Sequence, residues 1–258
     1  MCLHRAGFQL VILELEEPLA VRRSVSFSEA VYEGVQIIEG TRARLISLDQ
    51  LQASLEANEI PVIIDPQAKT LRDLLLTNSR STFVVDARLL KTVPELLDAT
   101  IPLYIGLGPG FIAGKNCHAV IETRRGHTLG RVYWTGSAQP DSGEPDGDRR
   151  RVLRAPQGGV LIAHAQIGDR LKEGQLIAEI LSENKAVNSP ILSPFKGTLR
   201  GLIRPGILLP KGIKVGDVDP RDDPLIHKLV SDKALAIGGA VLEILLSFMK
   251  LFEKRVAR

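Results

Sequence analysis

The sequence is poor in cysteine and has no long hydrophobic run. Only two cysteines occur, Cys2 and Cys117, so a disulfide-stapled scaffold is excluded and a reducing, cytoplasmic compartment is indicated. The most hydrophobic stretch, near 241–252, is shorter than the roughly 20 residues that a membrane-spanning helix needs. A cationic start, an apolar run and a small-residue cleavage site do not occur together, so no signal peptide is expected.

Neither sign of charge dominates. Lys and Arg number 33 and Asp and Glu number 30, which gives a formal net charge of +3. This balance does not support a nucleic-acid partner. With 258 residues, of which 44% are hydrophobic, the chain can form one large domain or two ordinary domains with a proper core.

Up to residue 150, short apolar runs alternate with helical patterns. Five of these runs predict strands: Gln9–Leu15, Pro61–Asp65, Thr82–Asp86, Leu103–Gly106 and Ala119–Glu122. The alternation predicts an α/β fold, with a Rossmann-like parallel sheet covered on both faces. Ligands bind beyond the carboxyl ends of strands in such sheets, where Glu14, Asp65 and Asp86 would lie.

The first residues resemble the last turn of a helix. Basic residues precede a glycine in Cys2–Gly7, as is typical of a helix C-terminus. A helix end followed by a parallel strand implies an earlier strand and loop. We therefore expect the Rossmann-like domain to be N-terminally truncated.

The pattern changes after residue 150. Short β segments separated by glycine turns fill Val152–Val218 and predict a compact barrel or sandwich. Two stretches, Gly168–Gly174 and Ser193–Gly197, are reminiscent of lipoyl or biotinyl carrier domains. The lysine near the expected hairpin tip, Lys185, lacks flanking methionines, so we favour a lipoyl-like module used for contacts over a covalently modified one.

A helical pattern resumes at Pro224 and continues to about Lys254, with Ser231 or Asp232 as the N-cap. The sequence therefore predicts three segments. They are a Rossmann-like α/β domain (1–150), a β-rich lipoyl-like barrel-sandwich module (151–221), and a C-terminal helical segment that packs back on the α/β domain (222–258).

The segment from 106 to 131 has the densest collection of groups that could bind an anion. Its glycines Gly106, Gly108 and Gly110 would expose backbone amides that can form an anion-binding nest. Cationic side chains would complete a phosphate site, namely those of Lys115, Arg124, Arg125 and Arg131. The plainer interpretation is a tight turn with solvated arginines.

This glycine segment is not by itself a standard dinucleotide site. The next predicted strand begins near Ala119, which leaves too little chain for a crossover helix. Glu14 stands where a ribose-binding carboxylate would lie, although a solvated strand-end acid is the alternative. Arg22 and Arg23 could bind a phosphate or an acidic partner, or be solvated.

Cys117 and His118 are the other candidates for chemistry. Neighbouring residues of an extended chain point to opposite faces, and no second Cys/His cluster exists. A passive, buried thiol is therefore favoured over a metal site, and no metal is expected.

Four stretches spread over nearly the whole chain resemble the YqeB family of accessory proteins for selenium-dependent molybdenum hydroxylases. The stretches are His4–Gly34, Gly106–Ala138, Lys214–Arg221 and Ser231–Glu243. Family members usually open with a strand and a glycine-rich loop, which Met1 replaces here. This departure agrees with a truncated or misassigned start.

The resemblance implies a cytoplasmic maturation factor for a molybdenum hydroxylase similar to xanthine dehydrogenase. We expect it to bind a phosphate-bearing ligand, a nucleotide or a molybdopterin-type cofactor, and the hydroxylase apoprotein through the β module. Two alternatives stay open. One is an NAD(P)-dependent oxidoreductase with His118 or His127 as proton donor, and the other is a ligand-free structural adaptor. Nucleic-acid and membrane partners are not expected.

Overall fold

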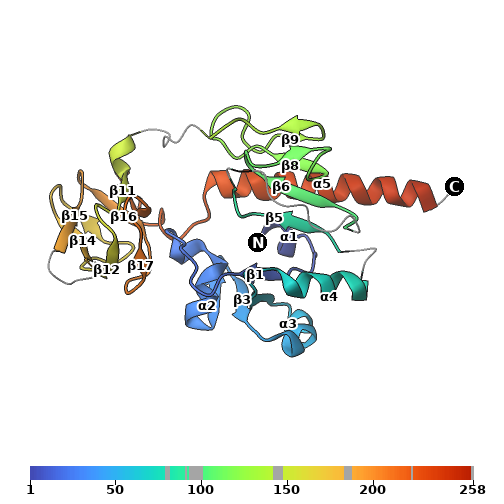
Figure 1. Cartoon of the computed structure of the whole chain (residues 1–258), viewed down its shortest axis with the longest axis horizontal. Coiled ribbons are helices and arrows are strands. Elements are labelled where there is room, and N and C mark those ends of the chain that lie inside the picture. Colours follow the sequence, from blue (N-terminus) through green and yellow to red (C-terminus); the bar gives the residue numbers. More distant parts are fainter. Residues whose placement is uncertain are drawn as a thin grey trace. The chain divides into compact units, whose positions relative to one another are not determined.

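The computed structural model describes residues 1–78, 82–90, 92, 101–141, 148–182, 188–221 and 223–256. It is a mixed α/β structure with two partly parallel sheets, several antiparallel sheets and a long C-terminal helix (Figure 1). The chain forms two compact units. Unit 1 contains Met1–Leu10, Gln67–Glu144 and Ser231–Arg258, and unit 2 contains Val11–Pro66 and Pro145–Val230.

Unit 1 is built around a four-stranded sheet with the order β5-β6-β8-β9. Its strands are β5 (Val84–Asp86), β6 (Tyr104–Leu107), β8 (Ala119–Ile121) and β9 (Val132–Tyr133). The first three are parallel and β9 is antiparallel to β8. A short pair is formed by β7 (Ile112–Ala113) and β10 (Gly136–Ser137). The strands predicted at 82–86, 103–106 and 119–122 are thereby confirmed.

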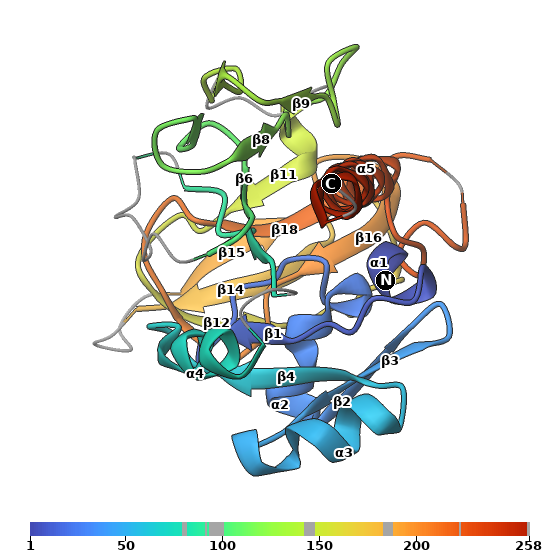
Figure 2. The same ribbon diagram turned by 90° about the vertical axis from the view of Figure 1, so that its right-hand side faces the viewer.

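The long helix α5 (Asp232–Val256) covers one face of this sheet (Figure 2). Sheet residues Leu103, Ile105, Ala119 and Ile121 pack against helix residues Ala240, Val241, Ile244 and Leu245. Burying one large aliphatic side chain stabilises the fold by roughly 1.5–3 kcal/mol, so this face holds the helix in place. No helix in the described ranges is both long enough and apolar enough to cross a bilayer.

Two further helices belong to unit 1. The short helix α1 (Cys2–Arg5) contacts α5. It is followed by Gly7 in the left-handed region, with φ 89°, so the predicted helix end is confirmed. Helix α4 (Lys69–Asn78) places Leu75 against the second face of the sheet, around Phe111.

Unit 2 contains a second partly parallel sheet, with the order β1-β4-β3-β2. Its strands are β1 (Ile12–Glu14), β2 (Val35–Ile38), β3 (Thr41–Leu45) and β4 (Ile60–Ile64). Strands β1 and β3 run parallel to β4. The β2–β3 hairpin turns at Glu39 and Gly40, which have φ 45° and 80°, as a two-residue hairpin turn requires.

The strands predicted to form one Rossmann-like sheet are therefore divided between two sheets. Hydrophobic periodicity identifies a strand, but it does not identify the neighbour with which the strand pairs.

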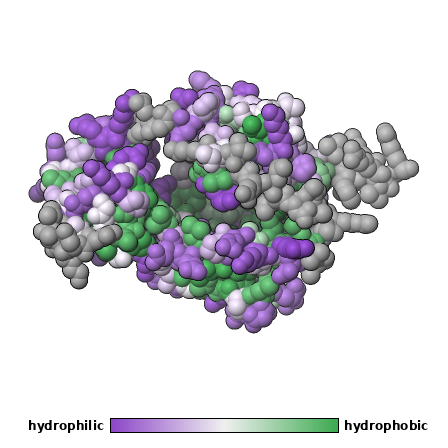
Figure 3. Space-filling view, in the orientation of Figure 1, coloured by the Kyte–Doolittle hydropathy of each residue, from purple (hydrophilic) through white to green (hydrophobic). Residues whose placement is uncertain are grey.

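The intervening helices of unit 2 are α2 (Ala30–Glu33) and α3 (Leu51–Glu56), with 3-10 turns at Arg23–Val25, Phe27–Glu29 and Leu48–Gln50. The face shown in Figure 3 carries both hydrophilic and hydrophobic patches, and Ile37 of β2 is 53% exposed.

The rest of unit 2 is antiparallel β structure, as predicted for the region after residue 150. One sheet has the order β11-β18-β16-β13 and the other β15-β14-β12-β17. The strands of the first are β11 (Val152–Arg154), β13 (Arg170–Leu171), β16 (Gly197–Leu202) and β18 (Lys214–Asp219). Those of the second are β12 (Gly159–Ala163), β14 (Leu176–Leu181), β15 (Asn188–Leu192) and β17 (Leu208–Leu209). Lys185 lies outside the described residues, so its role stays a prediction.

Ion pairs and close backbone packing attach the segment 21–33, which includes α2, to the β module within unit 2. Arg204 Nη1 lies 2.8 Å from a Glu29 carboxylate oxygen and 2.7 Å from one of Glu33, and its guanidinium lies over the Tyr32 ring. A Cβ on Gly201 would come within 2.7 Å of the Val21 carbonyl oxygen. The compact units thus cut across the ranges 1–150, 151–221 and 222–258, whose standing as separate domains remains a prediction.

Candidate functional site at a sheet edge of unit 1

The carboxyl ends of three parallel strands meet at one edge of the unit 1 sheet. Asp86 ends β5, Gly108 follows β6, and Glu122 follows β8. In open α/β sheets this edge is where ligands bind. It is therefore the first place to look for the predicted phosphate site.

Asp86 is a buried carboxylate that accepts from four donor groups, one of which is the Arg88 backbone amide at 3.1 Å. It accepts hydrogen bonds from Tyr104 Oη at 2.7 Å and from Arg88 Nε at 3.0 Å, and Arg88 Nη2 lies 2.5 Å away. Burial raises the pKa of Asp86, but the hydrogen bonds from Arg88 and Tyr104 outweigh it and hold the pKa below its ordinary value. Burial, followed by the hydrogen bond to Asp86, raises the pKa of Tyr104. Asp86 is therefore ionised, and its hydrogen-bonding partners are Arg88 and Tyr104.

The glycine turn after β6 is closely packed. A Cβ on Gly106 would lie 2.1 Å from Cγ of Phe111, and one on Gly110 would lie 2.4 Å from the Leu90 carbonyl oxygen. The Gly108 amide donates to the Ile121 carbonyl. Gly106, Gly108 and Gly110 are all buried. Close packing accounts for these glycines, and in this conformation they do not form an open nest of amides.

Glu122 fixes the loop that carries the predicted arginines. The residue is 1% exposed, and its carboxylate accepts from the Arg124 amide at 2.7 Å and from the Gln139 amide at 2.8 Å. The Glu122 amide donates to the Arg131 carbonyl and the Gly130 amide donates back to Glu122. The loop between β8 and β9 is thus closed at its base and held from within.

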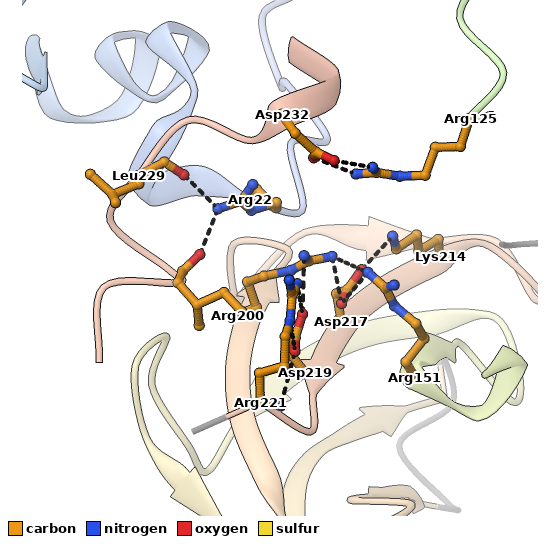
Figure 4. A network of polar contacts seen from close by, with 11 residues as sticks. Arg22, Arg125, Arg151, Arg200, Lys214, Asp217, Asp219, Arg221, Leu229 and Asp232 are labelled. Atoms are coloured by element: carbon orange, nitrogen blue, oxygen red, sulfur yellow. Dashed lines mark hydrogen bonds and ion pairs between the residues drawn. The ribbon is translucent and has the colours of Figure 1, made fainter. Parts of the chain in front are cut away.

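The three predicted arginines of this loop have different surroundings. Arg125 makes a two-pronged bond to Asp232 at the start of α5, with distances of 2.7 and 3.0 Å (Figure 4). Arg124 is exposed and donates to the neutral side chain of Gln139 at 3.2 Å. Arg131 is exposed. Within the described ranges neither Arg124 nor Arg131 has a carboxylate partner.

Lys115 lies at the other edge of the sheet. It is exposed in the turn before β8, at the amino end of that strand, whereas Arg124 follows the carboxyl end. His118 is also at the amino end, and its Nδ1 accepts from the Tyr104 amide at 2.9 Å. Arg124, Arg125 and Arg131 thus share one loop at the carboxyl edge, whereas Lys115 and His118 lie at the amino edge.

Cys117 is a buried free thiol. Burial raises its pKa to about 11, so the reactive thiolate is scarce at neutral pH. Across the described residues, no three His, Cys, Asp or Glu side chains form a group that could hold a metal ion.

The remaining predicted residues belong to unit 2. Glu14 ends β1, and its carboxylate accepts from the Leu15 amide at 2.7 Å. Arg22 donates to the carbonyls of Ile226 and Leu229 at 2.9 and 3.0 Å (Figure 4). Arg23 donates to the Leu202 carbonyl and pairs with Glu29. Both arginines thus make contacts within the fold.

The sequence interpretation missed the residues that hold this edge together: Arg88, Glu122 and Gln139. Arg88 stands two residues after a strand-end aspartate, a spacing that allows the local bond to Asp86. The sequence predicted Glu122 at a strand end. Its carboxylate also accepts from the Gln139 amide, 17 residues later, and a contact over that separation leaves no local signal in the sequence.

Comparison with known proteins gives one curated relative. No protein-family model matches the chain. The chain is 42% identical over 252 residues to the uncharacterized protein YqeB of Escherichia coli strain K12. The match covers 96% of this chain and 44% of that protein, so the chain spans less than half the length of the relative.

The solved structures found are distant. An aspartoacylase family protein from Mesorhizobium loti matches with a TM-score of 0.31 and 11% identity, over 83% of this chain and 86% of that one. The apo ectoine utilization protein EutE from Ruegeria pomeroyi matches with a TM-score of 0.26 and 18% identity, over 33% and 28% of the two chains. TM-scores this low carry no argument about function.

Proposed function

We propose that this homologue of YqeB is an accessory protein for a molybdenum hydroxylase, and that it binds a phosphate-bearing ligand at the carboxyl edge of the unit 1 sheet. The family resemblance supports the accessory role, with the hydroxylase apoprotein as partner. The choice of a phosphate-bearing ligand rests on two exposed arginines of one loop, Arg124 and Arg131, which have no carboxylate partner among the described residues.

Neither arginine forms an ion pair with Glu122, the acid at the base of their loop. Both oxygens of the Glu122 carboxylate accept backbone amides, and Arg124 donates to the uncharged Gln139. Guanidinium groups bind phosphate through paired N–H donors. A loop that is fixed at its base lowers the entropy lost when its side chains bind a ligand.

Only some of the residues predicted to bind the ligand keep that role in this proposal. Arg124 and Arg131 contact the phosphate of a nucleotide or a molybdopterin-type cofactor. Arg125 is committed to Asp232, and the glycines Gly106, Gly108 and Gly110 support the edge by packing.

A thermal-shift screen of the full chain with nucleotides, NAD(P) and molybdopterin tests the ligand class. A ligand that binds the native state raises its stability, and Arg124→Glu with Arg131→Glu should abolish that shift. Lys115→Glu is the matched control, because Lys115 is an exposed cation at the other edge, and it should leave the shift unchanged. An undiminished shift in the double variant would exclude the site.

The partner is tested separately, by titrating the purified chain with the apoprotein of a xanthine dehydrogenase-type hydroxylase. We expect complex formation that survives Arg124→Glu, because the β module makes the contact. A shift with NAD(P) alone and no complex would favour an oxidoreductase over an accessory protein.

A further inference from the structure

A second group of basic residues surrounds two buried aspartates in the β module of unit 2. Asp217 and Asp219 of β18 are 2% and 1% exposed. Arg200 of β16 lies between them, with Nη2 2.9 Å from Asp217 and Nη1 3.2 Å from Asp219 (Figure 4). The pairing register of β16 and β18 shifts between Leu199 and Gly201, so Arg200 occupies a bulge, which can redirect a side chain.

Arg200 by itself bridges both aspartates, yet three more cations reach them. Lys214 Nζ lies 3.0 Å from Asp217, and Arg151 Nη2 lies 3.4 Å from it. Arg221 binds Asp219 through Nε and Nη2 at 2.9 and 2.7 Å. Among the described residues the group therefore holds four cations and two carboxylates, which leaves two positive charges in excess there. Burial raises the pKa of Asp219, but its bonds to Arg221 and the charge of Arg200 lower it to about 2, so the carboxylate is ionised at neutral pH.

The hydrogen bonding of this group is also incomplete. The Nε–H groups of Arg151 and Arg200 are buried and have no acceptor among the described residues. Buried donors without acceptors are rare, and an unobserved ion or water is one of their ordinary explanations. The contact of Arg151 with Asp217 is the longest in the group, so this guanidinium is the least committed to its present partner.

Exposure shows from which side a ligand could arrive. The side chain of Arg200 is 9% exposed, whereas those of Arg151 and Lys214 are 22% and 38% exposed. Arg200 already neutralises Asp217, so Arg151 and Lys214 can turn to a ligand without leaving a buried charge unpaired. A phosphate group carries about −1.5 to −2 charges at pH 7, which matches the excess.

We propose that Arg151 and Lys214, supported by Arg200, bind a phosphate group on the surface of the β module. This site lies in unit 2 and goes beyond the proposed function, which concerns Arg124 and Arg131 of unit 1. The ligand is free phosphate or a phosphate monoester. In either case its oxygens accept from the guanidinium of Arg151 and the ammonium of Lys214.

Isothermal titration of the full chain with inorganic phosphate tests the proposal, with chloride holding the ionic strength constant. Arg151→Gln and Lys214→Gln should each weaken binding by about tenfold or more, as expected for the loss of a charged hydrogen bond. Lys172→Gln is the matched control, since Lys172 is an exposed lysine of the same module, and it should bind like the wild type. Adenosine monophosphate as a second titrant tells an esterified phosphate from a free one.

Two results would overturn the site: no phosphate binding by the wild type, or wild-type binding by the doubly substituted chain. The variant Arg124→Glu with Arg131→Glu separates the two proposals. If that variant alone loses phosphate binding, the unit 1 site is supported and the unit 2 site is refuted. Circular dichroism checks folding, and Lys214→Gln, which changes only a partly exposed side chain, keeps the test valid if Arg151→Gln unfolds.

Discussion

Sγ of Cys2 lies 2.9 Å from the point where a Cβ atom of Gly238 would be. The next helix residue, Gly239, has nothing within 4 Å of the same point. Two adjacent glycines of α5 therefore have different roles. The first allows α1 to lie against the helix, and the second leaves open space.

Alanine substitution should separate the two roles. Gly239→Ala should raise the free energy of unfolding by about 1 kcal/mol, because alanine favours the helix over glycine by that amount. Gly238→Ala should not raise the free energy of unfolding, since its methyl group would meet Cys2. Urea denaturation followed by circular dichroism measures both. An equal gain in the two variants would contradict the packing role, and adding Cys2→Ala to Gly238→Ala should recover part of the difference.

The glycine turn of unit 1 offers a second matched pair. Gly106→Ala should lower the free energy of unfolding by about 3 kcal/mol, at the upper end of the cost of overpacking a core, because its methyl group overlaps Phe111. Gly114→Ala meets no atom within 4 Å and should lose only the roughly 1–2 kcal/mol of left-handed backbone, since its φ is 83°. In a Phe111→Ala background the cost of Gly106→Ala should fall but not vanish, because the Cβ atom of residue 111 would still lie 2.6 Å from the new methyl group. An undiminished cost there would point to a role of Gly106 other than packing against the Phe111 ring.

The stability of the fold at acidic pH should depend on Asp219. Its pKa in the folded chain is about 2, below the ordinary value of about 3.9 for an unfolded chain. A lowered carboxyl pKa stabilises the fold above the unfolded value, and this stabilisation is lost as pH falls through the folded value. Wild-type stability should therefore decline between about pH 4 and pH 2.

Asp219→Asn should be less stable at pH 7 and should show a flatter decline over that window. Denaturation midpoints at a series of pH values measure the effect. Glu173→Gln, which changes an exposed acid of the same module, should reproduce the wild-type slope. The role of Asp219 would be refuted by parallel profiles for wild type and Asp219→Asn.

Local features of the fold could be predicted from the sequence because their causes are local. The β2–β3 hairpin follows from Glu39 and Gly40, and the end of α1 follows from Gly7. The division of strands between two sheets could not be predicted. Strand β4 has the same apolar character as β5, and nothing in either run states that β4 pairs with β1 and β3 while β5 pairs with β6.

The candidate site shows the same limit. Arg124, Arg125 and Arg131 were expected to lie near one another, and one short loop carries them all. Arg125 pairs with Asp232, which lies 107 residues away in the sequence. This ion pair could not be predicted from the sequence. The glycines were interpreted through their amides, whereas Phe111 gives Gly106 a steric role that depends on the direction of the Phe111 side chain.

The position of α5 in the sequence, well after the last strand of its sheet, sets the order in which unit 1 can be completed during synthesis. Its sheet is formed by residues from Val84 to Tyr133, but the helix that covers the Ile105 and Ile121 face starts at Asp232. A newly synthesised sheet therefore exposes this apolar face while the ribosome adds about a hundred more residues. Chaperones that shield apolar surface have their longest opportunity to act during that interval.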